Sequence, residues 1–402
     1  MTGRPNSGPI LLFRTRLHVP NNLLRRAIRP GSTVALADGA GAPSEVCADL
    51  CAAAREAGGV RLITGWLLEP PPGLDFTAFA EVRTFMAGYG TAAGIADGTV
   101  QYVPATVSQL PALLAGAWRP DTVVLSARRT SRGLALGSEV SWIATAAANA
   151  RHCLVEINDD LPDAARPGLV DTEKLTVVGE TRRAPINVAR ARQNEATTRI
   201  GAELAELVPA GAAIQFGPGA IGEALVGALN RPVGIDSGII TDAVVDLADR
   251  GLLIGQPLGT YLVGSPRLYE WASGREVLDR IEVTHDSSRL SGRDLVAVNT
   301  ALEIDSLGQI NVEAVGTRRI SGIGGHADYA ISGSRGVHGL SIIALPSVRN
   351  GRSTLVDRLS APVSTPRWAV DVVVTEFGRA DLRGLTDNER RTAIGALFPG
   401  AI

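Results

Sequence analysis

The chain has 402 residues, of which 45% are hydrophobic and 20% charged, as expected of a globular protein with a large buried core. Its 39 basic and 41 acidic residues give a net charge of −2, which argues against nucleic acid as a partner because phosphate binding needs a basic surface. The three cysteines form no disulfide framework, and neither they nor the five histidines show the spacing of a metal site.

The amino-terminal segment from Met1 to Gly8 is polar and rich in Pro and Gly, and no apolar run follows it. We therefore expect no secretory signal. Apolar runs elsewhere are short and interrupted, so no membrane span is expected. The few cysteines suit a reducing compartment, and we expect a cytoplasmic protein.

In the first half, short β-branched runs alternate with helical stretches, which is typical of β-α-β units and a largely parallel sheet. A small-residue loop at 38–42 is expected to lead from a strand into a helix over 43–57, and a short helix is expected over 144–150. The expected strands are 33–37, 60–63, 101–103, 122–125 and 153–157.

The second half repeats this pattern. Apolar and charged residues alternate at helical spacing from Glu195 to Leu207, followed by a strand over 213–216 and a helix over 221–229. The polar, turn-like stretch around 180–192 separates the two patterns. We expect two similar, open α/β domains at residues 1–187 and 188–402.

The turn Gly217-Pro218-Gly219-Ala220-Ile221-Gly222 follows the predicted strand and matches GxGxxG. That pattern places pyrophosphate on a helix N-terminus. Pro218 restricts the turn, however, and no partner acid follows. A plain strand-to-helix turn, or a turn beside a ligand pocket lined by Gly217 and Gly219, is favoured instead.

A second glycine-rich loop, Gly322-Ile323-Gly324-Gly325, allows close backbone approach to a ligand. Its N–H groups would suit the oxyanion that forms when an acyl carbonyl is attacked. The alternative is a buried tight turn without a ligand. Arg318 and Arg319 precede the loop, either as anion-binding residues or as an exposed pair.

His326 directly follows this loop and is a candidate general base, since imidazole titrates near neutral pH. An ordinary surface or core histidine is the alternative. Ser237 lacks a GxSxG context, which argues against a serine hydrolase. The alternating run 297–305 predicts a strand before a hairpin turn at 306–309, with Glu303 and Asp305 as edge charges.

Taken together, these segments resemble the acetyl-CoA hydrolase / 4-hydroxybutyrate CoA-transferase family. The block from Val374 to Gly384 is highly specific to that group. The resemblance implies two α/β domains of the CoA-transferase fold, a homodimer, and an active site between domains that takes coenzyme A as an acyl-CoA substrate. The other matching blocks are 195–230, 234–251, 263–269, 298–305, 319–325, 341–347 and 364–367, and the first half matches more loosely at 39–43 and 102–104.

One departure from the family is chemically important. Where the family shows Gly-Ile-His-Thr-Glu-Met, this chain has Gly238 at the position of the nucleophilic Glu and Asp236 at that of the His. Glycine forms neither an anhydride nor a glutamyl thioester. The resemblance also assigns Asn299 as a carboxamide donor, and the loop Gly322–Gly325 to the thioester oxygen and pantetheine.

We therefore expect an enzyme that acts on an acyl-CoA. Hydrolysis, at the thioester or at a β-keto C–C bond, is favoured over transfer of CoA. His326, Asp236 and Asn299 are the candidate catalytic residues. Two alternatives remain. One is a CoA-transferase that uses another carboxylate such as Asp236. The other is an acyl-CoA-binding protein without turnover.

Overall fold

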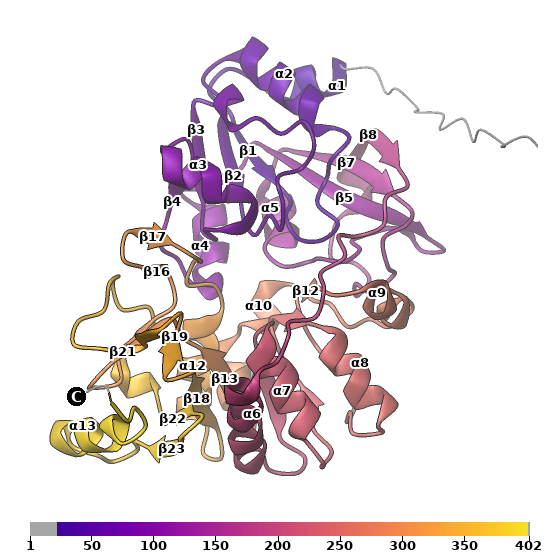
Figure 1. Cartoon of the computed structure of the whole chain (residues 1–402). Coiled ribbons are helices and arrows are strands. Elements are labelled where there is room, and N and C mark those ends of the chain that lie inside the picture. Colours follow the sequence, from indigo (N-terminus) through magenta and orange to yellow (C-terminus); the bar gives the residue numbers. More distant parts are fainter. Residues whose placement is uncertain (1–21, 401–402) are drawn as a thin grey trace, which may run out of the picture.

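The computed structural model describes residues 22–400. The segment from Met1 to Gly8, on which the expected lack of a secretory signal depends, lies outside this range. Two sheets dominate the molecule, one in the upper half of Figure 1 and one in the lower half. None of the helices within residues 22–400 combines the length and apolar character needed to cross a membrane.

The first sheet has the order β4-β3-β2-β1-β5-β7-β8, and all of these neighbours are parallel. Strand β6 pairs antiparallel with the end of β5. The strands are β1 (Thr33–Leu36), β2 (Arg61–Thr64), β3 (Glu81–Thr84), β4 (Gln101–Tyr102), β5 (Thr122–Thr130), β6 (Gly133–Ala135), β7 (His152–Asn158) and β8 (Leu175–Thr181).

Helices cover both faces of this sheet, because its central strands are apolar on both sides. Val34 and Leu36 share a buried cluster with α1 and α2, whereas Ala35 faces the cluster that contains α4 and α5. The helices of this half are α1 (Asn22–Ala27), α2 (Cys47–Ala57), α3 (Ala92–Asp97), α4 (Leu110–Ala115) and α5 (Ile143–Asn149), with short 3₁₀ turns η1 (Phe76–Ala78), η2 (Tyr89–Thr91), η3 (Val107–Gln109) and η4 (Thr172–Lys174).

The second sheet has the order β10-β9-β13-β18-β22-β23, and only its last pair is antiparallel. Its strands are β9 (Ala213–Phe216), β10 (Gly234–Ile235), β13 (Leu295–Thr300), β18 (Leu340–Ala344), β22 (Val372–Thr375) and β23 (Gly378–Asp381). The short strands outside both sheets are β11 (Ile239–Ile240), β12 (Tyr261–Leu262), β14 (Glu303–Asp305), β15 (Ile310–Asn311), β16 (Ala314–Val315), β17 (Arg318–Arg319), β19 (Val348–Arg349), β20 (Arg352–Ser353) and β21 (Leu355–Val356).

Side chains of β13 alternate between two helical layers, as the period of a strand requires. Val296 and Val298 pack with α6 and α7, whereas Leu295 and Ala297 pack with Tyr329 of α12. The helices of this half are α6 (Glu195–Leu207), α7 (Ala220–Ala228), α8 (Asp242–Asp249), α9 (Pro266–Ala272), α10 (Ile281–Thr284), α11 (Ser287–Ser291), α12 (His326–Arg335) and α13 (Asp387–Gly395), with the 3₁₀ turn η5 (Arg367–Ala369).

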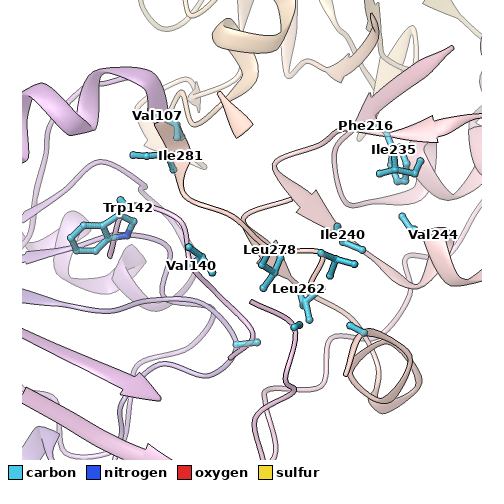
Figure 2. Close-up of a cluster of buried hydrophobic side chains, with 14 of the residues drawn as sticks. Val107, Val140, Trp142, Phe216, Ile235, Ile240, Val244, Leu262, Leu278 and Ile281 are labelled. Carbon is cyan, nitrogen blue, oxygen red and sulfur yellow. The ribbon is translucent and has the colours of Figure 1, made fainter. Parts of the chain in front are cut away.

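One cluster of buried hydrophobic side chains joins the two halves. Val140 and Trp142 of the first half lie in the same cluster as Leu262 and Leu278 of the second half (Figure 2). The expectation of two largely parallel α/β halves is confirmed. The boundary between residues 187 and 188 falls in a stretch without regular structure and stays a prediction.

The predicted helices and strands agree best with the structure where the spacing of apolar residues is regular. The helix Glu195–Leu207 and the strand Ala213–Phe216 are confirmed, and so is the hairpin of β14 with β15. The expectation that Glu303 is an edge charge is wrong. It is buried and accepts hydrogen bonds from Asn311 Nδ2 (2.8 Å) and Ser360 N (2.8 Å).

Candidate active site between the two halves

A cavity of about 320 Å³ lies where β9 and β13 end, between the two halves. Its wall includes Phe85, Met86 and Tyr89 from the first half, and Gln215 and Asn299 from the second. The carboxyl ends of neighbouring parallel strands are where open α/β sheets bind their ligands. This cavity is therefore the candidate site.

Two amide side chains form its floor. Gln215 pairs in register with Ala297, two residues before Asn299, so both side chains leave the sheet on the face covered by α12. Both are buried, and Gln215 Nε2 lies 3.4 Å from Asn299 Oδ1. Asn299 Nδ2 and Gln215 Oε1 have no partner. Since an unpaired buried donor is costly, we infer that Asn299 Nδ2 serves an acceptor on a ligand.

The glycines of the loop Gly322–Gly325 are required by contact with the first half. A Cβ at Gly322 would lie 2.3 Å from the carbonyl oxygen of Phe85, and Gly324 has a φ of +60°. The amide of Ile323 donates to the hydroxyl of Tyr102 (3.2 Å) and is not free for a ligand. Gly325 caps the start of α12 without a side-chain cap.

His285, which no sequence pattern singled out, lies on the cavity wall beside this loop. Its Nε2 is 2.5 Å from the position that a Cβ at Gly325 would occupy, so only glycine fits there. The ring also packs against Tyr329, with centroids 4.9 Å apart. Burial, and then the nearby Arg289 guanidinium, lowers the pKa of His285 to about 3.

The hydrogen bonds of Thr284 indicate the tautomer of His285. The Thr284 hydroxyl lies 3.3 Å from the carbonyl oxygen of Arg280 and 2.9 Å from His285 Nδ1. That hydroxyl has one hydrogen, and the carbonyl only accepts. Both contacts are satisfied when Nδ1–H donates to the hydroxyl. Nε2 is then the unprotonated nitrogen, and it faces Gly238 and Gly325.

His326 is the first residue of α12 and lines the same cavity. Its Nδ1 lies 2.7 Å from the Thr365 hydroxyl, and its Nε2 is buried without a hydrogen-bond partner. Burial lowers the pKa of His326 to about 4. Both histidines of the cavity are therefore uncharged at neutral pH.

Gly238 lines the cavity, whereas Asp236 does not. Strand β10 ends at Ile235, so Asp236 and Gly238 both lie beyond it. The buried Asp236 carboxylate accepts from Arg289 Nη1 (2.5 Å) and Nη2 (2.9 Å) and from Arg293 Nη1 (3.0 Å). Its oxygens are engaged away from the cavity.

Of the other residues that the sequence singled out, some line the cavity and others do not. Gly217 lines the cavity, but Gly219 lines a neighbouring one. Arg319 is not a free anion site, since it pairs with Glu313 (3.0 Å) and lies over the ring of Tyr102 (4.1 Å). Ser237 donates to the Phe216 carbonyl oxygen (3.0 Å), so its hydroxyl is occupied.

The composition of the wall limits its chemistry. Among residues 22–400, those that line this cavity include no aspartate, glutamate, cysteine or lysine. Its polar groups come from backbone amides, Ser, Thr and Tyr side chains, two carboxamides and two uncharged imidazoles, together with the single guanidinium of Arg349. Nor does any cluster of acidic, His or Cys side chains suited to a metal occur in that part of the chain.

The fold and the cavity define an α/β protein with two largely parallel sheets and a candidate site between its halves. A model of the acetyl-CoA hydrolase/transferase C-terminal domain matches residues 264–397. The 4-hydroxybutyrate coenzyme A transferase of Clostridium kluyveri is 26% identical over 332 residues, which cover 78% of this chain and 77% of that protein. Residues 264–397 therefore match the C-terminal domain of the acetyl-CoA hydrolase/transferase family, and the chain as a whole is similar to CoA-transferases.

Other relatives carry different activities in their names. The acetyl-CoA hydrolase of Eremothecium gossypii is 30% identical over 215 residues, or 50% of this chain and 40% of that protein. The crystal structure of RipA from Yersinia pestis superposes with a TM-score of 0.84 at 25% identity, covering 94% of this chain and 93% of that one. A 4-hydroxybutyrate CoA-transferase from Porphyromonas gingivalis has a TM-score of 0.75 at 24% identity, covering 96% and 95%. The CoA-transferase fold expected from the sequence is thereby confirmed.

Proposed function

We propose that this protein hydrolyses an acyl-CoA thioester in the cavity, with water as the direct nucleophile. One observation carries the proposal: residue 238 is a glycine on the cavity wall, and none of the lining residues within 22–400 bears a carboxylate. A covalent relay through an acyl anhydride needs such a carboxylate. The names of the relatives support a CoA thioester as the ligand.

The polar groups of the wall suit the steps of this reaction. Asn299 Nδ2, which has no partner, would donate to the thioester carbonyl oxygen, and the uncapped start of α12 would stabilise the negative charge that develops on it. The acyl chain would occupy the apolar part of the cavity.

His285 is the group best suited to activate water. Its unprotonated Nε2 lies beside Gly238, where the missing side chain leaves space. Nε2 would take a proton from water while the water oxygen bonds to the carbonyl carbon. The C–S bond then breaks, and the imidazolium returns the proton to the departing thiolate, giving a carboxylic acid and free CoA. His326, the base expected from the sequence, lines the same cavity with a buried Nε2 and is proposed to position the acyl group.

The alternatives make different predictions. A transferase that uses Asp236 would need that carboxylate to leave two arginines. A binder without turnover would release no CoA. Cleavage of a β-keto C–C bond would use the same groups but leave the thioester intact. The homodimeric state and the cytoplasmic location stay predictions from the family resemblance and from composition.

The test is to incubate the purified protein with a panel of acyl-CoA thioesters and to measure free thiol. We expect CoA release without any acceptor acid, a loss of about 100-fold or more in kcat for H285Q, and a smaller loss for the matched variant H326Q. Covalent CoA on an acidic residue would overturn the proposal. So would ligand-induced thermal stabilisation with no CoA release, which is the behaviour of a binder.

A further inference from the structure

Arg349 contributes the only formally charged side chain among the described residues that line the cavity. It belongs to β19, which forms a tight hairpin with β20 in which Arg349 pairs with Arg352. Its Nη2 donates to the carbonyl oxygen of Ala301 (3.1 Å), just beyond the end of β13. The sheet end and the hairpin thus hold the guanidinium at the cavity wall.

This guanidinium lacks the partner that a partly buried cation normally has. Within residues 22–400, no carboxylate pairs with Arg349, and its Nη2 donates to Ala301 O. Burial lowers the pKa of Arg349, with no nearby carboxylate to offset the loss of solvent. Arginine remains charged under these conditions and carries five N–H donors. An anionic group on the ligand would supply the missing partner.

The surroundings of Arg349 narrow the chemistry of that ligand. Ala301, Leu302 and Val312 lie on the same wall, and both histidines of the cavity are uncharged at neutral pH. An aliphatic segment that ends in an anion would match an apolar wall with one cation.

A second cavity of about 440 Å³ indicates where the coenzyme would extend. Trp66, Tyr89 and Pro218 lie on the walls of both cavities, whereas Arg349 lines only the first. The long pantetheine arm needs room beyond the first cavity, and the second cavity adjoins it at these shared residues. With the coenzyme on that side, Arg349 would contact the acyl group.

We propose that Arg349 binds a carboxylate at the far end of the acyl chain, so that the substrates are CoA thioesters of dicarboxylic acids. This inference rests on the proposed function, because it assumes that an acyl-CoA occupies the cavity. A CoA phosphate would offer similar anionic oxygens, and the test separates the two sources.

The test compares thioesters of equal carbon number: succinyl-CoA with butyryl-CoA, and glutaryl-CoA with pentanoyl-CoA. Dissociation constants are measured by calorimetry, together with CoA release, for the wild type, R349Q, R349K and R352Q. Arg352 is the exposed hairpin partner and serves as the matched control. We expect the wild type and R352Q to bind at least one dicarboxylic thioester roughly tenfold or more tightly than its methyl-ended counterpart. R349Q should lose this preference, and R349K should retain part of it.

Three results would overturn the inference. One is a wild type without preference for the dicarboxylic thioester. Another is R349Q binding all four thioesters and free CoA equally weakly, which would assign Arg349 to a phosphate. The third is no binding of any acyl-CoA to a folded wild type, which removes the proposed function as well. Binding with the expected preference but without CoA release would leave the role of Arg349 standing and reject hydrolysis alone.

Discussion

His285 Nε2 lies 3.4 Å from the point that the Cβ of a side chain at residue 238 would occupy. The imidazole therefore faces the position at which the family resemblance places the nucleophilic glutamate. This distance is an ordinary van der Waals contact, and Gly238 does not have a positive φ. Both facts make residue 238 the sharpest place to test the chemistry.

The Cβ of a glutamate introduced by G238E would meet no clash, because the three nearest heavy atoms, from His285 and Tyr329, lie at 3.4 Å or more. We expect the variant to fold and to form a covalent acyl or CoA adduct with an acyl-CoA, which borohydride or hydroxylamine traps and peptide mass spectrometry locates at residue 238. G238A is the control and should form no adduct. A folded G238E that binds acyl-CoA yet gives no adduct would contradict the assignment of this position to the nucleophile.

Removal of the Asn299 carboxamide should affect the reaction more than the fold. Since Asn299 Nδ2 has no partner in the free protein, N299A loses little more than the 3.4 Å contact with Gln215. We expect a fall in kcat of about 100-fold, as for loss of one oxyanion donor, with a melting temperature within a few degrees of wild type. Steady-state kinetics and thermal melts check this. Unchanged kcat in N299A would remove Asn299 from the mechanism.

The pH dependence of hydrolysis should lack the usual histidine limb. Burial lowers the pKa of His285 from 6.5 to about 3, so the base stays unprotonated as the pH falls from 8 to 5. We expect kcat/KM to stay flat over that range. An acid limb near pH 6.5 that disappears in H285Q would mean that the ring is far more solvated than this packing indicates.

The same lowered pKa has a consequence for stability. Unfolded His285 binds a proton below about pH 6.5, but the native ring does not until about pH 3. The unfolded state therefore holds more protons in this window, and stability falls as the pH falls through it. H285Q should weaken this dependence in urea titrations at pH 7 and pH 5.

Asp236 should prove structural. Its buried carboxylate holds Arg289 and Arg293, so D236N leaves two guanidinium groups without their anion. We expect a loss of about 3–5 kcal/mol in the free energy of unfolding. The control D381N breaks an exposed pair with Arg383 and should cost about 1 kcal/mol or less. If folded D236N instead loses turnover with its stability intact, Asp236 belongs to the reaction.

The stability contribution of the buried Glu139 should depend on pH in the opposite direction to that of His285. Burial raises the pKa of Glu139 from 4.5 to about 7, so the native state keeps a proton that the unfolded state loses between these values. Stability should then fall as the pH rises from 4.5 to 7, by roughly 3 kcal/mol for this group. E139Q should flatten that slope in denaturant titrations. A wild type that gains stability over this range relative to E139Q would contradict the assignment.

The sequence alone determined the alternation of strands and helices and a minority of the residues that line the site. Helix periodicity located Glu195–Leu207, and strand-loop-helix order located Gly217. Gly322, Gly324 and Gly325 were recognised because glycine clusters mark places where backbones approach closely. Asn299 and the substituted position Gly238 came from the resemblance, which depends on residue order alone.

The tertiary structure decided which of these residues meet. His285 and Arg349 carried no local pattern, since each is a single side chain that gains its role from groups distant in the chain. Asp236 was a candidate because of its position in the family motif, and the sequence did not indicate that β10 ends one residue earlier or that two arginines hold its carboxylate. Sequence periodicity reports local backbone geometry, but the contacts of a buried charge depend on the packing of distant elements. Only the folded chain sets that packing.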